Sequence, residues 1–154
     1  MSTQSLQTTA ATTVNIMGAS ITILVSSDQT EGIYSVVEVA TPPRLPGPPL
    51  HMHKRMTESF YVLSGTPELF LDGVWTSVSP GESFVVPSNT LHSYRNPTDR
   101  PARFLAVAPG HDRFFLEIAE WMQREPSWPP PDRQALGQFL SRHDTFYAAP
   151  PTGA

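Results

Sequence analysis

The sequence predicts a mainly β fold, a sandwich or barrel of short strands, followed by a helical C-terminal part. Through the middle of the chain, short segments rich in β-branched and aromatic residues alternate with turn residues. The pairs Asp72-Gly73 and Pro80-Gly81 are typical of the tight turns that join such strands. Beyond Gly110 the apolar residues take the spacing of a helix instead. Many short strands with regularly placed turns are typical of β-sandwiches and barrels.

The individual strands are predicted from their β-branched composition. Residues 21–25 and 34–39 are rich in such residues, and the polar segment 28–32 between them is typical of a hairpin loop. Five of the 17 prolines lie in residues 42–49. Because proline fixes φ and lacks a backbone N–H, this segment is expected to be an extended lead into the next strand. Further strands are expected at residues 69–71, 74–76, 83–86, 91–95 and 102–108.

Two helices are predicted after residue 110. Asp112 and Asp132 are candidate N-caps, because each precedes apolar residues that recur at helical spacing. The simplest role for the two apolar faces is to pack on the outside of the barrel or to form a dimer interface. The alternative is that one helix covers the mouth of the barrel and contributes Phe114, Phe115 or Trp121 to a substrate pocket.

Three histidines and one carboxylate form a pattern that predicts a single metal site. His51 and His53 are separated by one residue, which places both side chains on the same face of a strand. Glu58 and His92 complete the candidate set. Imidazole nitrogens and a carboxylate oxygen suit one divalent transition metal ion such as Fe, Mn, Ni, Cu or Zn. Such a metal accepts further ligands, so positions remain for water, substrate or dioxygen, as is typical of a catalytic site.

One stretch of the chain resembles the first sequence motif of the cupin superfamily. Four residues separate His53 from Glu58 and six separate Glu58 from Gly65, as in that motif. Three residues lie between Gly47 and His51, fewer than is usual. This difference concerns the loop that leads into the strand and not the candidate ligands.

A second stretch resembles the other cupin motif. Gly81, Pro87, His92 and Asn96 stand at the spacing of that motif. Asn89 occupies a position that is usually glycine. Asparagine is the non-glycine residue that best tolerates a left-handed turn, so this segment is expected to keep the turn.

The resemblance implies a cupin-type double-stranded β-helix, or jelly-roll barrel, over residues 15–110. Residues 1–14 are expected to be a flexible arm, and residues 111–154 are expected to form helices packed on the barrel. The resemblance also favours a homodimer. The segments that are most similar to small single-domain quercetin 2,3-dioxygenase-like cupins are residues 48–53, 58–65 and 86–96.

This resemblance implies a metal-dependent dioxygenase that acts on a flavonol or a similar small hydroxylated aromatic substrate. Glu58 is the candidate catalytic residue, because it could bind the metal or take a proton from a hydroxyl of the substrate. The first alternative is a redox-neutral metal enzyme, such as an isomerase, cyclase or dehydratase, that needs no oxygen and tolerates zinc. The second is a non-catalytic small-molecule-binding cupin, against which the open four-ligand site argues.

Strand alternation predicts an apolar, aromatic pocket beside the metal. Side chains two residues apart share a face of a strand, so Phe60 and Val62 are expected beside Glu58. His111 and His143 lie outside both motifs and are interpreted as packing or surface residues. Core packing is the alternative role for most of the pocket candidates. The candidate substrate-binding residues are Phe60, Val62, Phe84, Tyr94, Phe104, Phe114 and Phe115.

Composition limits the partners and the compartment. The 154 residues, 39% of them hydrophobic, suit one domain with its own core. A net charge of −4 without a basic run argues against nucleic acid or an anionic membrane as a partner. Cysteine is absent, which excludes disulfides and thiolate metal sites. Residues 1–14 lack the features of a signal peptide, so a cytoplasmic protein is expected. Its expected partner is a small-molecule substrate.

Overall fold

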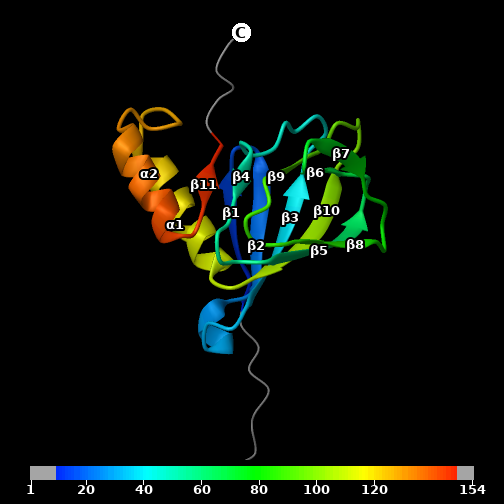
Figure 1. The fold of residues 1–154 in the computed structure, drawn as a ribbon, viewed down its shortest axis with the longest axis horizontal. Coiled ribbons are helices and arrows are strands. Elements are labelled where there is room, and N and C mark those ends of the chain that lie inside the picture. Colours follow the sequence, from blue (N-terminus) through cyan, green and yellow to red (C-terminus); the bar gives the residue numbers. More distant parts are fainter. Residues whose placement is uncertain (1–9, 149–154) are drawn as a thin grey trace, which may run out of the picture.

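The computed structural model describes residues 10–148 and consists of two antiparallel β-sheets that face each other, with two helices on one side (Figure 1). In spatial order, the six-stranded sheet contains β1 (Thr12–Ile16), β2 (Ala19–Val25), β3 (Ser35–Thr41), β10 (Ala102–Ala108), β5 (Glu58–Ser64) and β8 (Ser83–Val86). The five-stranded sheet contains β11 (Phe146–Tyr147), β4 (His51–Met52), β9 (His92–Arg95), β6 (Glu68–Leu71) and β7 (Val74–Ser77). The predicted jelly-roll barrel with a C-terminal helical part is confirmed.

The helical layer follows β10 along the chain (Figure 1). Helix α1 (His111–Arg124) packs against β1 and β3, and α2 (Arg133–Arg142) contacts β11. A short 3-10 helix, η1 (Ser27–Thr30), joins β2 to β3 and also contacts α1. Within residues 10–148, no helix has both the length and the apolar character that are needed to cross a membrane.

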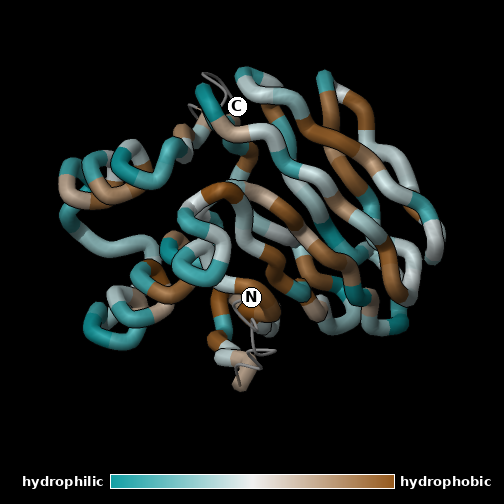
Figure 2. The backbone as a smooth tube through the Cα atoms, turned by 90° about the horizontal axis from the view of Figure 1, so that it is seen from below, coloured by the Kyte–Doolittle hydropathy of each residue, from teal (hydrophilic) through white to brown (hydrophobic). Residues whose placement is uncertain are grey.

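The core lies between the sheets because the strands alternate inward apolar and outward polar side chains. One row of inward side chains crosses four neighbouring strands in register, and none of its members is more than 2% exposed. Full burial of each such side chain stabilises the fold by about 1.5–3 kcal/mol. Figure 2 shows the hydrophobic stretches along the strands and hydrophilic residues on the outer turns of the helical layer. The row consists of Ile21, Val39, Phe104 and Val62.

The predicted turns have the backbone conformations that their residues favour. Asp72 and Gly73 both have positive φ, at 47° and 90°, which is the type I′ hairpin geometry. Gly81 has φ of 88°, as the third position of a type II turn requires. Asn89 has φ of 61°, so asparagine does adopt the left-handed conformation at the position that is glycine in the motif.

The structure corrects the expected boundaries of the barrel. Strand β1 begins at Thr12, so the last three residues of the expected arm belong to the sheet, while residues 1–9 lie outside the described part of the chain. At the other end, β11 adds a strand to the five-stranded sheet from a region that was expected to be helical only. Strands β1 and β11, from the two ends of the described residues, are thus edge strands of the two sheets, and the helices precede the last strand.

The two predicted helix starts have different outcomes. Asp132 is the N-cap of α2, because its carboxylate accepts a hydrogen bond from the backbone N–H of Ala135 at 2.9 Å. Asp112 is not an N-cap. Gly110 occupies that position of α1, with φ of 65°, and Asp112 is buried with its carboxylate turned toward Ser27. The buried contact with a distant turn, which no local pattern reveals, decides the orientation of Asp112.

We predict that replacing Gly47 by alanine strongly destabilises the barrel. Gly47 has φ of 81°, and a Cβ atom at this position would lie 1.6 Å from the carbonyl oxygen of Tyr94. Relief of this clash requires the backbone to move, so Gly47→Ala should lower the free energy of unfolding by about 2 kcal/mol or more. The measurement is chemical denaturation. The control is Gly137→Ala in α2, which meets no atom within 4 Å and should gain up to about 1 kcal/mol. Equal effects of the two substitutions would contradict the close approach at Gly47.

Candidate metal centre

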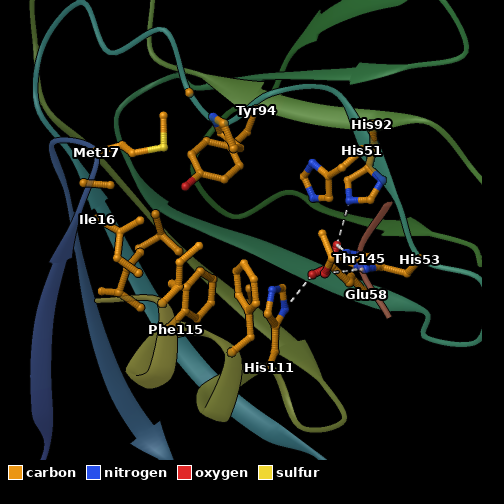
Figure 3. Close-up of a pocket in the computed structure, with 18 of the residues that line it drawn as sticks. Ile16, Met17, His51, His53, Glu58, His92, Tyr94, His111, Phe115 and Thr145 are labelled. Carbon is orange, nitrogen blue, oxygen red and sulfur yellow. Dashed lines mark hydrogen bonds and ion pairs between the residues drawn. The ribbon is translucent and has the colours of Figure 1, made fainter. Parts of the chain in front are cut away.

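His51, His53, Glu58 and His92 converge in the wall of a cavity in the barrel (Figure 3). Each of them offers one nitrogen or oxygen atom, and these atoms all lie within 4.8 Å of one another. His53, Glu58 and His92 are at most 2% exposed, and His51 is half-buried. The sequence-predicted ligand set is therefore one compact cluster.

Both sheets contribute to this cluster. His51 in β4 pairs with His92 in β9, so their two rings lie on adjacent strands with centroids 4.3 Å apart. His53 follows directly after β4, and its ring centroid is 5.2 Å from that of His51. Glu58 is the first residue of β5, on the opposite sheet. The site thus depends on the distance between the sheets as well as on the two-residue spacing of the histidines.

Backbone carbonyl oxygens orient all three imidazoles. A carbonyl oxygen only accepts hydrogen bonds, so each Nδ1 in such a contact carries the hydrogen and, in a neutral ring, Nε2 keeps its lone pair. This arrangement is typical of metal-binding histidines. It directs the three Nε2 atoms toward the cluster. The contacts are His51 Nδ1 to Pro49 O at 2.8 Å, His53 Nδ1 to Asp144 O at 2.9 Å, and His92 Nδ1 to Thr90 O at 2.9 Å.

The carboxylate of Glu58 faces these nitrogens. Its Oε2 atom lies 2.9 Å from Nε2 of His92 and 3.3 Å from Nε2 of His53. Among the described residues, Nε2 of His53 has no hydrogen-bond partner although it is buried. A buried polar atom without a partner costs free energy, and a cation bound among these lone pairs would remove that cost. The donor set therefore fits a divalent metal ion of the kind predicted from the sequence.

Burial and the close contact of Glu58 with the imidazoles set the charges of the cluster. Burial lowers the pKa of His51 to about 3, so its ring is neutral. Burial acts to raise the pKa of Glu58, but its interactions with His111 and with the surrounding imidazoles hold that pKa well below its usual range. Burial likewise acts to lower the pKa of His53, but the hydrogen bond and charge of Glu58 raise it. Glu58 is thus ionised, and its negative charge favours a positive charge beside it, which a bound cation would supply.

Asp144 is a part of the site that the sequence did not reveal. Its carboxylate accepts hydrogen bonds from three consecutive backbone N–H groups, and its carbonyl oxygen accepts from His53. Asp144 therefore fixes the loop between His53 and Glu58. No local pattern could indicate this, because 91 residues separate the two partners. The three N–H groups are those of Lys54 at 3.2 Å, Arg55 at 2.8 Å and Met56 at 2.9 Å.

The cavity beside the cluster has mostly apolar walls. Phe60, Tyr94, Phe114 and Phe115 line it, as predicted, and Figure 3 shows the hydroxyl of Tyr94 pointing into it. Helix α1 packs on the barrel and also brings Phe114 and Phe115 to the cavity, while their role in substrate binding stays a prediction. The walls that the sequence did not indicate come from the β1–β2 turn, the lead into β4 and the C-terminal strand, and they include Ile16, Met17, Leu45, Ile118, Thr145 and Tyr147.

Three predicted pocket residues and one helix residue do not line the cavity. Val62 and Phe104 belong to the buried row of the core, and Phe84 stacks on the outer side of Phe60 with centroids 4.7 Å apart. These side chains support the wall instead of forming it, because the strand positions next to the cavity are taken by Phe60 and Tyr94. Trp121 packs against Trp128 and Phe139 between the helices.

His111 was interpreted as a packing or surface residue, and the structure shows it buried against Phe115 but also in contact with Glu58, which the sequence did not indicate. Its Nδ1 atom lies 2.7 Å from Oε1 of Glu58, inside the cavity (Figure 3). His143 does lie outside the cavity walls, where its Nε2 contacts Glu117 at 3.0 Å. The fold brings the start of α1 over the barrel mouth, and this placement separates the two histidines.

Comparison with known proteins agrees with this architecture. Residues 37–108 match the family model described as "Cupin domain". Quercetin 2,3-dioxygenase of Bacillus subtilis (strain 168) is 36% identical over 71 residues, which are 46% of this chain and 21% of that protein. This chain therefore matches about a fifth of the length of that relative.

Solved structures show the same fold. The polyketide cyclase RemF from Streptomyces resistomycificus superposes with a TM-score of 0.59 at 23% identity, over 70% of this chain and 80% of the cyclase. A sugar phosphate isomerase of the cupin superfamily from Silicibacter pomeroyi has a TM-score of 0.52 at 27% identity, over 60% of this chain and 59% of the isomerase. One barrel thus serves proteins with different reactions, and the fold by itself does not select among them.

We predict that Asp144→Ala weakens metal binding without changing any candidate ligand. The substitution removes three acceptor contacts from the loop before Glu58, and removal of such supporting groups typically costs about 10–100-fold in metal affinity. The measurement is a competition titration of the chelated protein with Co²⁺. The control is Asp132→Ala, which loses the cap of α2 and about 1 kcal/mol of stability but should keep the affinity. Equal affinities in the two variants would exclude the supporting role.

Proposed function

We propose that this protein is a metal-dependent enzyme that acts on a small, hydroxylated aromatic or enolic substrate, and that its reaction is a dioxygenation. The observation that carries the proposal is the position of the donor cluster. Three Nε2 atoms and a carboxylate lie together in the wall of a cavity whose other walls are mostly apolar and aromatic. Such a cavity suits a flat apolar molecule with an oxygen at one end.

The metal would be held by His51, His53, Glu58 and His92. When bound, a divalent transition metal lowers the pKa of a hydroxyl that it binds and, if redox-active, supports chemistry with dioxygen. The apolar walls exclude water from the reacting group, which strengthens every electrostatic interaction inside the cavity. Several divalent transition metals suit this donor set, and elemental analysis of the purified protein identifies the one that is bound.

Glu58 is the proton acceptor in this proposal. Its carboxylate is 1% exposed and ionised, and Oε2 is the oxygen that faces the imidazoles. A substrate hydroxyl that enters the cluster would lose its proton to this carboxylate when Glu58 swings away from the metal. The product of that step is an oxyanion, which is the electron-rich form that reacts with an electrophile or with dioxygen.

Tyr94 is proposed to orient the substrate. Burial raises the pKa of its hydroxyl, so the group keeps its hydrogen and can donate it to a second oxygen of the substrate. The aromatic rings of Phe60, Phe114 and Phe115 offer faces for an aromatic ring. A hydroxylated aromatic compound therefore satisfies both ends of the cavity.

The redox-neutral alternative has its own support. His111 places a second polar group beside Glu58, and such a pair suits proton transfer between two positions of one substrate, as in a cyclase, isomerase or dehydratase. Both reactions use the same donors and the same base. They differ in the consumption of oxygen, which the assay below measures. A non-catalytic binding protein would turn over no substrate at all.

We predict that Glu58→Gln lowers the rate of turnover far more than it lowers the affinity for the substrate. The amide still offers an oxygen to a metal but cannot take a proton, and the loss of a general base typically costs about 10²–10⁴ in rate. Metal content, affinity for a phenolic ligand and oxygen uptake would be measured on one preparation. The control is Glu38→Gln, which breaks an ion pair with Arg103 on the exposed side of the sheet.

Two outcomes would contradict the proposal at different points. Turnover of Glu58→Gln within a few-fold of wild type, with metal retained, would show that Glu58 is not the base. Turnover of the wild type under nitrogen, with zinc loaded, would favour the redox-neutral reaction and exclude the dioxygenation.

A further inference from the structure

His111 is a buried polar residue that neither sequence motif includes. It is the first residue of α1, 8% exposed, and its Nδ1 lies 2.7 Å from Oε1 of Glu58. The contact has the length of an ion pair but not the angles of a hydrogen bond, and neither atom has a hydrogen-bond partner among the described residues. Each of the two atoms therefore has the other as its polar contact.

The ring of His111 is held in place by aromatic packing. It stacks on Phe115 with centroids 4.5 Å apart and planes at 13°, and its centroid is 5.8 Å from that of Phe114. His53 lies on the other side, with ring centroids 5.7 Å apart. These contacts leave the ring little freedom to turn away from Glu58.

The backbone of His111 is anchored by the next residue. Asp112 is 2% exposed, and its carboxylate accepts hydrogen bonds from the backbone N–H of Ser27, at 2.9 Å, and from the Ser27 hydroxyl. Its own backbone N–H donates to Oγ of Ser35 at 3.3 Å. The start of α1 is thus tied to η1 and to β3. This explains why Asp112 is turned inward and does not cap the helix.

The two oxygens of Glu58 consequently have separate surroundings. Oε2 faces the Nε2 atoms of His53 and His92, whereas Oε1 faces His111 (Figure 3). Without His111, Oε1 would be buried beside aromatic carbon. The carboxylate would then gain by turning both oxygens toward the imidazole cluster.

We propose that His111 is a positioning residue, which holds Oε1 of Glu58 so that only Oε2 is presented to the three imidazoles. Glu58 then offers a single oxygen to a bound metal. This inference rests on the proposed metal site and not on the reaction that follows. His111 itself contributes no ligand, because its Nδ1 lies outside the group of four whose donor atoms fall within 4.8 Å of one another.

The test compares two substitutions of His111. In His111→Asn the side-chain amide can place an N–H near the position of Nδ1, whereas His111→Phe keeps the aromatic packing and removes the polar contact. The probe is Co²⁺ added to chelated protein, and the readouts are its visible absorption spectrum and its affinity. His111→Phe should change the spectrum and weaken the affinity about 10–100-fold. His111→Asn should restore the spectrum of the wild type. His143→Asn is the control, because His143 contacts Glu117 outside the cavity.

A second measurement examines the contact in chelated protein. The melting temperature would be recorded for His111→Phe, Glu58→Gln and the double variant. If the two side chains act as a pair, the shift of the double variant should be clearly smaller than the sum of the single shifts.

Each outcome bears on one claim. Additive shifts together with an unchanged Co²⁺ spectrum in His111→Phe would overturn the positioning role. Loss of Co²⁺ in both His111 variants would make His111 a ligand and would overturn it as well. Failure of the wild type to bind Co²⁺ would overturn the proposed metal site itself, and the melting temperatures would then show whether the pair exists without it.

Discussion

The burial of Glu58 is the constraint on which the rest of the site depends. A carboxylate that is 1% exposed, on the inward face of an apolar strand, carries a large desolvation cost unless partners compensate it. Three imidazoles surround it: His53 and His92 at Oε2, and His111 at Oε1. The Nδ1 atoms of His53 and His92 donate hydrogen bonds to backbone carbonyl oxygens. In the neutral rings, the Nε2 lone pairs therefore face the carboxylate of Glu58. A divalent cation satisfies this arrangement better than further hydrogen bonds would.

The helical tail is part of the site and not an appendage of the barrel. Helix α1 brings His111 and Phe115 to the cavity, and the segment after α2 brings Asp144 to the loop that joins His53 to Glu58. Strand β11 then pairs with β4, beside His51. Because these contacts join the last part of the chain to the first motif, we expect the metal centre to form only when the C-terminal segment is in place.

The sequence predicted those features of the site that depend on short spacing. The two-residue interval of His51 and His53 and the inward alternation of Glu58 and Phe60 are local geometry, and the chain cannot avoid them once the strands form. His111 and the β1–β2 turn reach the cavity, and Asp144 reaches the loop before Glu58, only through tertiary packing, which leaves no periodic pattern in the sequence. Val62, Phe84 and Phe104 point inward as predicted. Their depth within the barrel, which the sequence does not reveal, determines that they do not line the cavity. The expected homodimer and the cytoplasmic location stay predictions.

The metal content of the purified protein tests the central claim most directly. The account predicts one transition metal ion per chain in the wild type, bound at about 2.0–2.3 Å from its ligands. It predicts large losses of metal in His51→Ala, His53→Ala and His92→Ala, with the far-ultraviolet β signature retained, because the barrel has its own core. Elemental analysis of the four proteins decides the matter. Full retention of the metal in any two of the three variants would contradict the assignment of this cluster as the metal centre.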